Sequence, residues 1–340
     1  MDYKSAGVDI DAGNETVRRI KALARGTFTP GVMSEIGSFG GLFRLGDRYQ
    51  DPVLVSSADG VGTKLKIAFL TGRHDTIGAD LVNHCVNDIL VHGAAPLFFL
   101  DYLATGRLSP DVAEQVMTGV ARACTENGCA LLGGETAEMP GFYADGEYDI
   151  AGFIVGAVEK TKIVDGRAIV PGDVLIGLPS SGLHTNGYSL ARRVFFELAQ
   201  WKPDKFVREL GVTLADALLA PHRSYLPFVR PLLERHYVRG LAHITGGGIT
   251  DNLPRVLPEG CAAEIDRRSW SIPPIFRLLQ QHGRISDEEM FRTFNMGIGL
   301  IVACAPRDAE RVVNTVSLAG EPNAVRIGFV VSGDRTVRYV

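Results

Sequence analysis

The sequence predicts an α/β protein with about two domains. Its 340 residues exceed the common size of a single domain. Apolar, strand-like runs alternate with segments of helical periodicity. The 39 glycines gather where apolar runs end, as at residues 60–62, 133–134 and 246–248. Such strand–glycine–helix junctions are where α/β proteins build phosphate sites.

Composition and charge exclude several classes of protein. A hydrophobic content of 46% and a charged content of 22% are ordinary for a globular enzyme. The formal net charge is −4 without a basic stripe, so neither nucleic acid nor a membrane is an expected partner. The longest apolar runs are too short to span a bilayer, and the N-terminus lacks an apolar signal core. Five scattered cysteines without a Cys-x-x-Cys pair predict free thiols in a reducing cytoplasm.

The first domain is predicted over residues 1–168. Residues 11–14 offer the N-cap of a short helix, whose apolar stripe includes Val17 and Ile20. A later helix begins at Pro110 and stops at Gly128. Apolar periodicity predicts the other elements: a helix at 77–91 and strands at 42–45, 53–56, 97–102, 131–132 and 150–158.

The second domain is predicted over residues 169–340. The boundary follows from a polar segment that ends in Pro171 and Gly172. A new set of strand, glycine loop and helix then begins. Its predicted elements are strands at 173–178, 298–303 and 325–331, helices at 188–200 and 214–235, and a turn at 243–248.

The segment 57–64 is the most informative motif. It follows an apolar, β-branched run and precedes another apolar run, which predicts a strand, a glycine turn and a helix. Gly60 and Gly62 let the backbone approach a ligand closely. Asp59 places a carboxylate at the strand tip, and Thr63 and Lys64 follow the turn. This set suits a phosphate that arrives with Mg²⁺, although the residue order is not that of a Walker A loop.

The predicted helix 77–91 has one polar arc. Its members are Asp80, Asn83, His84, Asn87 and Asp88. A solvated outer face is one interpretation of such an arc. However, the arc has no Lys, Arg or Glu, and short side chains with fixed donors and acceptors favour a buried polar site.

A second carboxylate motif lies at residues 131–138. Glu135 follows an apolar run and two glycines, which fits either a capped turn or a ligand site. If Asp59, Asp88 and Glu135 converge, their mutual repulsion requires a cation or a proton, and Mg²⁺ carrying a triphosphate is the natural occupant for oxygen ligands.

Two glycine loops carry the remaining candidates. His184 lies inside the loop 180–187, where it is either structural or a proton-transfer group. The loop 243–250 has three consecutive glycines, a costly choice for a plain turn. It fits either a backbone nest for a phosphate monoester or a crowded strand–helix crossing.

The ordered set of motifs resembles the phosphoribosylformylglycinamidine cyclo-ligase family, also called aminoimidazole ribonucleotide synthetases. The resemblance runs from Tyr3 to the C-terminal strands. Two small departures are Ala58, where the family often has Thr, and Ser38, where Gly is common. The matching segments are residues 3–14, 59–64, 74–78, 85–88, 96–102, 133–141, 180–189, 243–248 and 292–295.

The resemblance implies an ATP-dependent ligase of purine biosynthesis. Formylglycinamidine ribonucleotide is closed to aminoimidazole ribonucleotide, with release of ADP and phosphate. Two domains are implied, each a mixed sheet packed against helices, in a homodimer whose N-terminal sheets pair into a barrel-like core. The implied residue roles are Mg²⁺ binding by Asp59, Asp88 and Glu135; ATP binding by Lys21, Gly60, Gly62, Thr63, Lys64, Asn87 and Asp101; orientation or proton transfer by His184 and Asn186; and grip of the substrate phosphate by Thr245, Gly246, Gly247 and Gly248.

Other interpretations stay open at this level. Another ATP-dependent enzyme of the same superfamily is the nearest alternative. Selenophosphate synthetase would need an early reactive cysteine, and none precedes Cys85. Thiamine-monophosphate kinase and the hydrogenase-maturation dehydratase share the Asp-Gly turn but are not expected to carry the loops at 133–141 and 180–187 in this form. A nucleotide-binding protein without turnover is the alternative from another class.

Overall fold

The computed structural model describes residues 5–37 and 39–340. Tyr3 and Lys4, which contribute to the resemblance, and Ser38, which departs from it, lie outside the described residues. The chain forms two compact units. Unit 1 comprises residues 1–89 and 94–161, and unit 2 comprises residues 90–93 and 162–340. Within the described part of the chain, no helix is long and apolar enough to cross a membrane.

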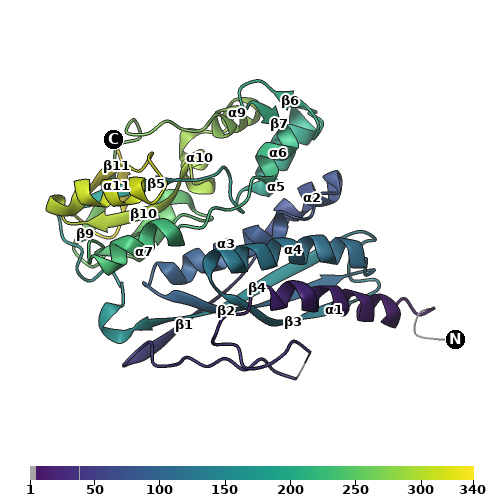
Figure 1. Ribbon diagram of the computed structural model, residues 1–340. Helices are drawn as coiled ribbons and strands as arrows, with labels where there is room; N and C mark the ends of the chain where they lie inside the picture. Colours follow the sequence, from purple (N-terminus) through teal and green to yellow (C-terminus); the bar gives the residue numbers. More distant parts are fainter. Residues whose placement is uncertain (1–4, 38) are drawn as a thin grey trace. The chain divides into compact units, whose positions relative to one another are not determined.

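Unit 1 is a four-stranded sheet in the order β1-β4-β2-β3, with helices α1, α3 and α4 on one face (Figure 1). Only the pair β2 and β3 is parallel, and β1 forms one edge. The loop between α1 and β1 runs along the opposite face, where the ring of Phe43 contacts that of Phe98. Its elements are α1 (Ile10–Arg25), β1 (Pro52–Gly60), η1 (Gly62–Lys64), α2 (Leu65–Thr71), α3 (Ile77–Leu90), β2 (Ala95–Thr105), α4 (Pro110–Asn127), β3 (Ala130–Glu138), β4 (Tyr148–Glu159) and η2 (Lys160–Lys162).

Unit 2 is built on a six-stranded sheet in the order β12-β9-β11-β5-β10-β8, with a separate β6-β7 hairpin. Ile249 and Leu253 join the core that covers this sheet. Its strands are β5 (Val174–Pro179), β6 (Phe206–Val207), β7 (Val212–Thr213), β8 (Gly240–His243), β9 (Cys261–Ile265), β10 (Ile298–Cys304), β11 (Val325–Ser332) and β12 (Val337–Tyr339). Its helices are α5 (Tyr188–Arg192), the π-helix η3 (Arg193–Leu198), α6 (Leu214–Leu219), α7 (Leu226–Glu234), α8 (Gly248–Asn252), η4 (Leu253–Arg255), α9 (Pro274–Gly283), α10 (Asp287–Thr293), η5 (Pro306–Asp308) and α11 (Ala309–Leu318).

The mixed α/β class is confirmed, whereas three local predictions are wrong. Helix α1 starts before residues 11–14, because the Asp9 carboxylate caps the N–H groups of Asp11 and Ala12. Residues 42–45 form no strand and contribute a single bridge, from Phe43 to Val32. The helix predicted over 214–235 is interrupted between α6 and α7. Ala220 precedes a proline, which disfavours helical backbone, and its ψ is 123°.

Candidate functional site

Asp59 and Asp88 lie on either side of one histidine in unit 1. Strand β1 continues through residue 60, so Asp59 belongs to the strand rather than to the turn. Its Oδ2 lies 2.8 Å from His84 Nε2. The same nitrogen lies 3.8 Å from Asp88 Oδ2, which also accepts a hydrogen bond from Ser57 at 3.0 Å. The edge strand and helix α3 therefore bring two of the three predicted metal ligands together.

Burial and charge act in opposite directions on this group. Burial alone would lower the pKa of His84, but the hydrogen bond with Asp59 and the charges of Asp88 and Asp80 raise it above its ordinary value. Burial would raise the pKa of Asp59, whereas His84 and the Gly60 N–H lower it. The Asp59 carboxylate is thus held ionised, as a hard oxygen ligand for a divalent cation must be.

Glu135 lies outside this group. In the sheet register, Asp59 and Asp101 share a row with Gly134, whereas Glu135 pairs with Tyr102 in the next row. Side chains alternate between faces along a strand, so the backbone directs Glu135 to the opposite face from Asp59. Its carboxylate is exposed and raises the pKa of Asp101.

Asp101 is a buried carboxyl in the middle of β2. A side chain at position 134 would collide with its Oδ1, so Gly134 makes room for this group. Burial, and secondarily the charge of Glu135, raise the pKa of Asp101 to about 7. The group is therefore partly neutral at physiological pH.

An Asp101→Asn variant should be more stable than the parent protein at high pH. A carboxyl whose pKa is raised in the folded state contributes stability that is complete below its unfolded pKa and is lost as pH rises through about 7. We expect a gain of roughly 2–4 kcal/mol at pH 8 that vanishes below about pH 4. Urea unfolding across this pH range measures it, with Asp149→Asn at an exposed site of β4 as control. A gain that does not vary with pH would contradict the assignment.

The turn after β1 exposes its backbone to a ligand, whereas the ammonium group of Lys64 is buried. Gly62, with a φ of 64°, and Thr63 are exposed. The Nζ of Lys64 is completely buried and donates to Asp80 Oδ1 at 2.7 Å. Asn87, also predicted to bind ATP, is completely buried on α3. In this structure, the ammonium of Lys64 therefore stabilises the contact between the turn and α3.

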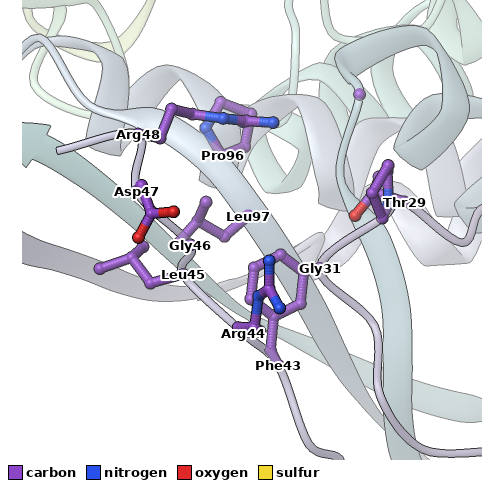
Figure 2. A pocket seen from close by; sticks show the side chains of 12 residues that line it. Thr29, Gly31, Phe43, Arg44, Leu45, Gly46, Asp47, Arg48, Pro96 and Leu97 are labelled. Atoms are coloured by element: carbon purple, nitrogen blue, oxygen red, sulfur yellow. The ribbon is translucent and has the colours of Figure 1, made fainter.

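Lys21 and a separate pocket belong to the N-terminal part of unit 1. A Cβ on Gly37 would lie 2.9 Å from Lys21 Nζ, so this lysine reaches the glycine-rich segment. Residues on both sides of this segment, together with part of β2 and Gly128, line a pocket of about 470 Å³ (Figure 2). Its lining residues are Thr29, Pro30, Gly31, Phe43, Arg44, Leu45, Gly46, Asp47, Arg48, Pro96, Leu97 and Gly128, and it contains none of the predicted site residues.

In unit 2, the loop between β5 and α5 folds around His184. The ring is 1% exposed, and its Nε2 accepts a hydrogen bond from the Ser181 N–H at 3.2 Å. A Cβ at position 299 of β10 would lie 2.6 Å from His184 Cε1 and would also collide with the Tyr225 hydroxyl. Gly299 thus lets the imidazole rest directly on the sheet. His184 is buried and oriented by its own loop.

The second glycine loop of unit 2 adjoins the first. A Cβ on Gly246 would lie 3.0 Å from Asn186 Oδ1. The Asn252 amide shapes this second loop, because its Nδ2 donates to the carbonyls of Gly246 at 3.1 Å and Gly248 at 2.8 Å. The structure therefore brings the predicted orienting residue Asn186 next to the predicted phosphate loop.

Sequence reasoning missed several residues that shape these sites. Asn295 holds the first loop, accepting from the Ser180 hydroxyl and donating to the Gly182 carbonyl. Asn252 holds the second loop, and His222 contacts the rings of both His184 and His243. Asn252 and Asn295 lie in or beside motifs of the sequence analysis, and an Asn close to glycines was the available signal. His222 lies in no motif.

Comparisons with known proteins agree with one family. The N-terminal domain model of the AIR synthase related proteins matches residues 41–158, and the C-terminal domain model matches residues 170–340. Phosphoribosylformylglycinamidine cyclo-ligase of Trichlorobacter lovleyi is 56% identical over 331 residues, covering 97% of this chain and 95% of that protein. The cyclo-ligase of Syntrophotalea carbinolica is 54% identical over 346 residues, covering 100% and 98%.

Solved structures show the same fold at low sequence identity. Thiamine-monophosphate kinase from Stenotrophomonas maltophilia K279a has a TM-score of 0.71 at 18% identity, over 96% of this chain and 95% of that one. The hydrogenase maturation protein HypE, solved in complex with ATP, has a TM-score of 0.69 at 20% identity, over 95% and 90%. The fold is shared more widely than the sequence, and the sequence decides the assignment: the chain belongs to the phosphoribosylformylglycinamidine cyclo-ligase family.

Proposed function

We propose that this protein closes formylglycinamidine ribonucleotide to aminoimidazole ribonucleotide in purine biosynthesis, consuming ATP. The observation that carries the proposal is similarity above 50% along nearly the whole chain to proteins named for this reaction. The five free, buried cysteines fit a reducing cytoplasm as its location. On this proposal, residues 1–168 form the ATP-binding and dimerisation domain, and residues 169–340 bind the substrate.

The chemistry requires an amide oxygen to become a leaving group. Phosphorylation by ATP achieves this, after which the neighbouring amidine nitrogen attacks and closes the five-membered ring. Almost all of the catalysis of such a transfer is positioning and charge stabilisation. A protein for this reaction must therefore hold the triphosphate, hold the substrate, and stabilise the developing negative charge.

The first domain supplies the triphosphate site. Asp59 and Asp88 place carboxylate oxygens on adjoining elements and fit Mg²⁺, which would neutralise phosphate charge when bound. The resemblance implies Glu135 as a third ligand, but the sheet register directs its side chain to the opposite face from Asp59, so Glu135 does not join this metal site. The backbone at the half-buried Gly60 and at the exposed Gly62 and Thr63 would hold the phosphates. The buried side chains of Lys64 and Asn87 would support this turn. Asp101 would line the site within the sheet, and Lys21 would cover the nucleotide.

The second domain supplies the substrate site. The backbone of Thr245, Gly246, Gly247 and Gly248, held in shape by Asn252, would grip the ribose 5′-phosphate. Asn186 adjoins this loop and would orient the formamide. The Nε2 of His184 accepts a hydrogen bond within its own loop, which favours an orienting role for His184.

Release of ADP provides the decisive test. The purified enzyme with Mg²⁺ and ATP should release ADP only when formylglycinamidine ribonucleotide is present, with aminoimidazole ribonucleotide formed in equal amount. A kinase of the same fold would instead phosphorylate a stable acceptor. ATP binding without substrate-dependent release of ADP would favour a nucleotide-binding protein without turnover and contradict the proposal.

We also propose a homodimer formed through the sheet of unit 1. Edge strand β1 leaves Leu54 64% exposed, and Phe153 on β4 is 43% exposed on the same face of the sheet. Phe98 and Leu100 of β2 continue this apolar face and are only half-buried. An apolar sheet face beside an edge strand is a natural surface for pairing with a second copy. The barrel-like core implied by the resemblance would arise there.

A Phe153→Arg variant should weaken this dimer because it places a charge in the centre of the proposed interface. Light scattering should give the mass of a dimer for the parent protein and of a monomer for the variant at the same concentration. Phe206→Arg, at an exposed position of β6, is the matched control and should leave the mass unchanged. A parent protein that is monomeric at working concentration would refute the homodimer.

A further inference from the structure

Three buried histidines of unit 2 form a chain of contacts with His222 in the middle. The ring of His184 stacks on that of His222, with centroids 4.0 Å apart and an interplanar angle of 23°. The Nε2 of His222 lies 3.0 Å from the Nε2 of His243. All three side chains are at most 7% exposed. The central one, His222, comes from the connection between α6 and α7, outside both glycine loops.

The second nitrogen of His222 reaches the loop that carries His184. Its Nδ1 lies 3.3 Å from the Thr185 hydroxyl. Thr185 stands between His184 and Asn186 in sequence, and His243 leads into the loop 245–248. The imidazole of His222 therefore links Thr185, in the loop 180–187, to His243, which precedes the loop 245–248.

Proton counting makes this bridge directional. A neutral imidazole has one N–H donor and one bare acceptor nitrogen. Where two such nitrogens meet, one must carry a proton and the other must not. If His222 donates from Nε2, then His243 is protonated at Nδ1, and Thr185 donates its hydroxyl to His222. If His243 donates instead, every hydrogen bond of the chain reverses.

We propose that His222 is a positioning residue, which sets the tautomer of His243 and the hydroxyl direction of Thr185 so that both glycine loops present one fixed pattern of donors and acceptors to the substrate. The inference rests on the proposed function and names a residue that shapes the substrate site. A purely structural role would require only that the side chain fill its space and stack on His184. Phenylalanine could replace His222 in the structural role, because it fills the space and stacks. It could not replace His222 in the positioning role, because it makes neither hydrogen bond.

The test compares His222→Phe with His222→Gln. Phenylalanine keeps the ring stacked on His184 but offers neither hydrogen bond, whereas glutamine can still donate to or accept from His243. We expect kcat for substrate-dependent ADP release to fall by roughly 10–100-fold in His222→Phe, comparable to the loss when the partner that fixes the tautomer of a metal-bound imidazole is removed. KM should change little, and His222→Gln should recover part of kcat. His236→Gln, at an exposed histidine of the same unit, is the control.

The tautomer itself provides a second measurement. In ¹⁵N-histidine-labelled protein, the ring nitrogens of His243, assigned with a His243→Gln variant, should report one dominant tautomer that changes in His222→Phe. Normal kcat in a folded His222→Phe variant would overturn the inference. If that variant fails to fold, equal populations of both His243 tautomers in the parent protein would overturn it. Absence of substrate-dependent ADP release in the parent protein would instead refute the proposed function, and the tautomer measurement would still decide the role of His222.

Discussion

Replacing Lys64 with Met should lower the free energy of unfolding by about 3–5 kcal/mol, because it leaves a buried carboxylate without its cation. The Nζ of Lys64 and Oδ1 of Asp80 are 2.7 Å apart, and both side chains are completely buried. Methionine fills a similar volume, so the loss reports the charge rather than a cavity. Urea unfolding followed by circular dichroism measures it.

Two further variants make the result specific. Lys66→Met, two residues away, removes a partner of Glu147 from a pair that is 40% and 34% exposed, and should cost only about 0–1 kcal/mol. The double variant Lys64→Met, Asp80→Leu removes both buried charges and should regain most of the lost stability. If Lys64→Met costs no more than Lys66→Met, the buried pair does not stabilise the turn.

An Asp59→Asn variant should lose substrate-dependent ADP release by about 10²–10³-fold, comparable to removal of one strong electrostatic stabiliser of a transition state. The substitution preserves shape but removes the carboxylate proposed to hold Mg²⁺ and the charge beside His84. Rates measured over a range of Mg²⁺ concentrations should show a higher requirement for the ion.

The control for this variant is Asp51→Asn, which changes an exposed carboxylate just before β1. It should behave as the parent protein does. Near-normal turnover of Asp59→Asn with Mg²⁺ and ATP would remove Asp59 from the metal site. Equal losses in both variants would indicate a general effect of charge and not a ligand.

The helices and strands with strong periodicity were predictable from sequence. The pattern over 77–91 predicted α3 with an end shifted by one residue. Its polar arc is buried except for Asp88, which is half-buried, as the absence of long charged side chains indicated. Strand ends were less predictable. Asp59 lies within β1 because β4 pairs with it as far as Gly60, and that pairing is decided by residues 151–159.

The contacts inside the candidate sites depend on distant parts of the chain. The partner of Lys64 stands 16 residues later on α3, and His222 stands 37 residues beyond Thr185. The face occupied by Glu135 depends on a register shift between Phe99 and Leu100 that no local pattern reveals. Local periodicity therefore predicts which segments carry the chemistry, while tertiary pairing decides which side chains meet.

Gly299 has no side chain, and this affects the mobility of the loop that carries His184. The His184 ring rests on the backbone of β10, a strand that is buried along its whole length. A loop anchored on such a strand cannot lift away without exposing buried backbone of β10. Its opening should therefore require a free energy close to that of unfolding the whole unit, so that the Ser181 amide exchanges with solvent deuterium as slowly as the sheet itself.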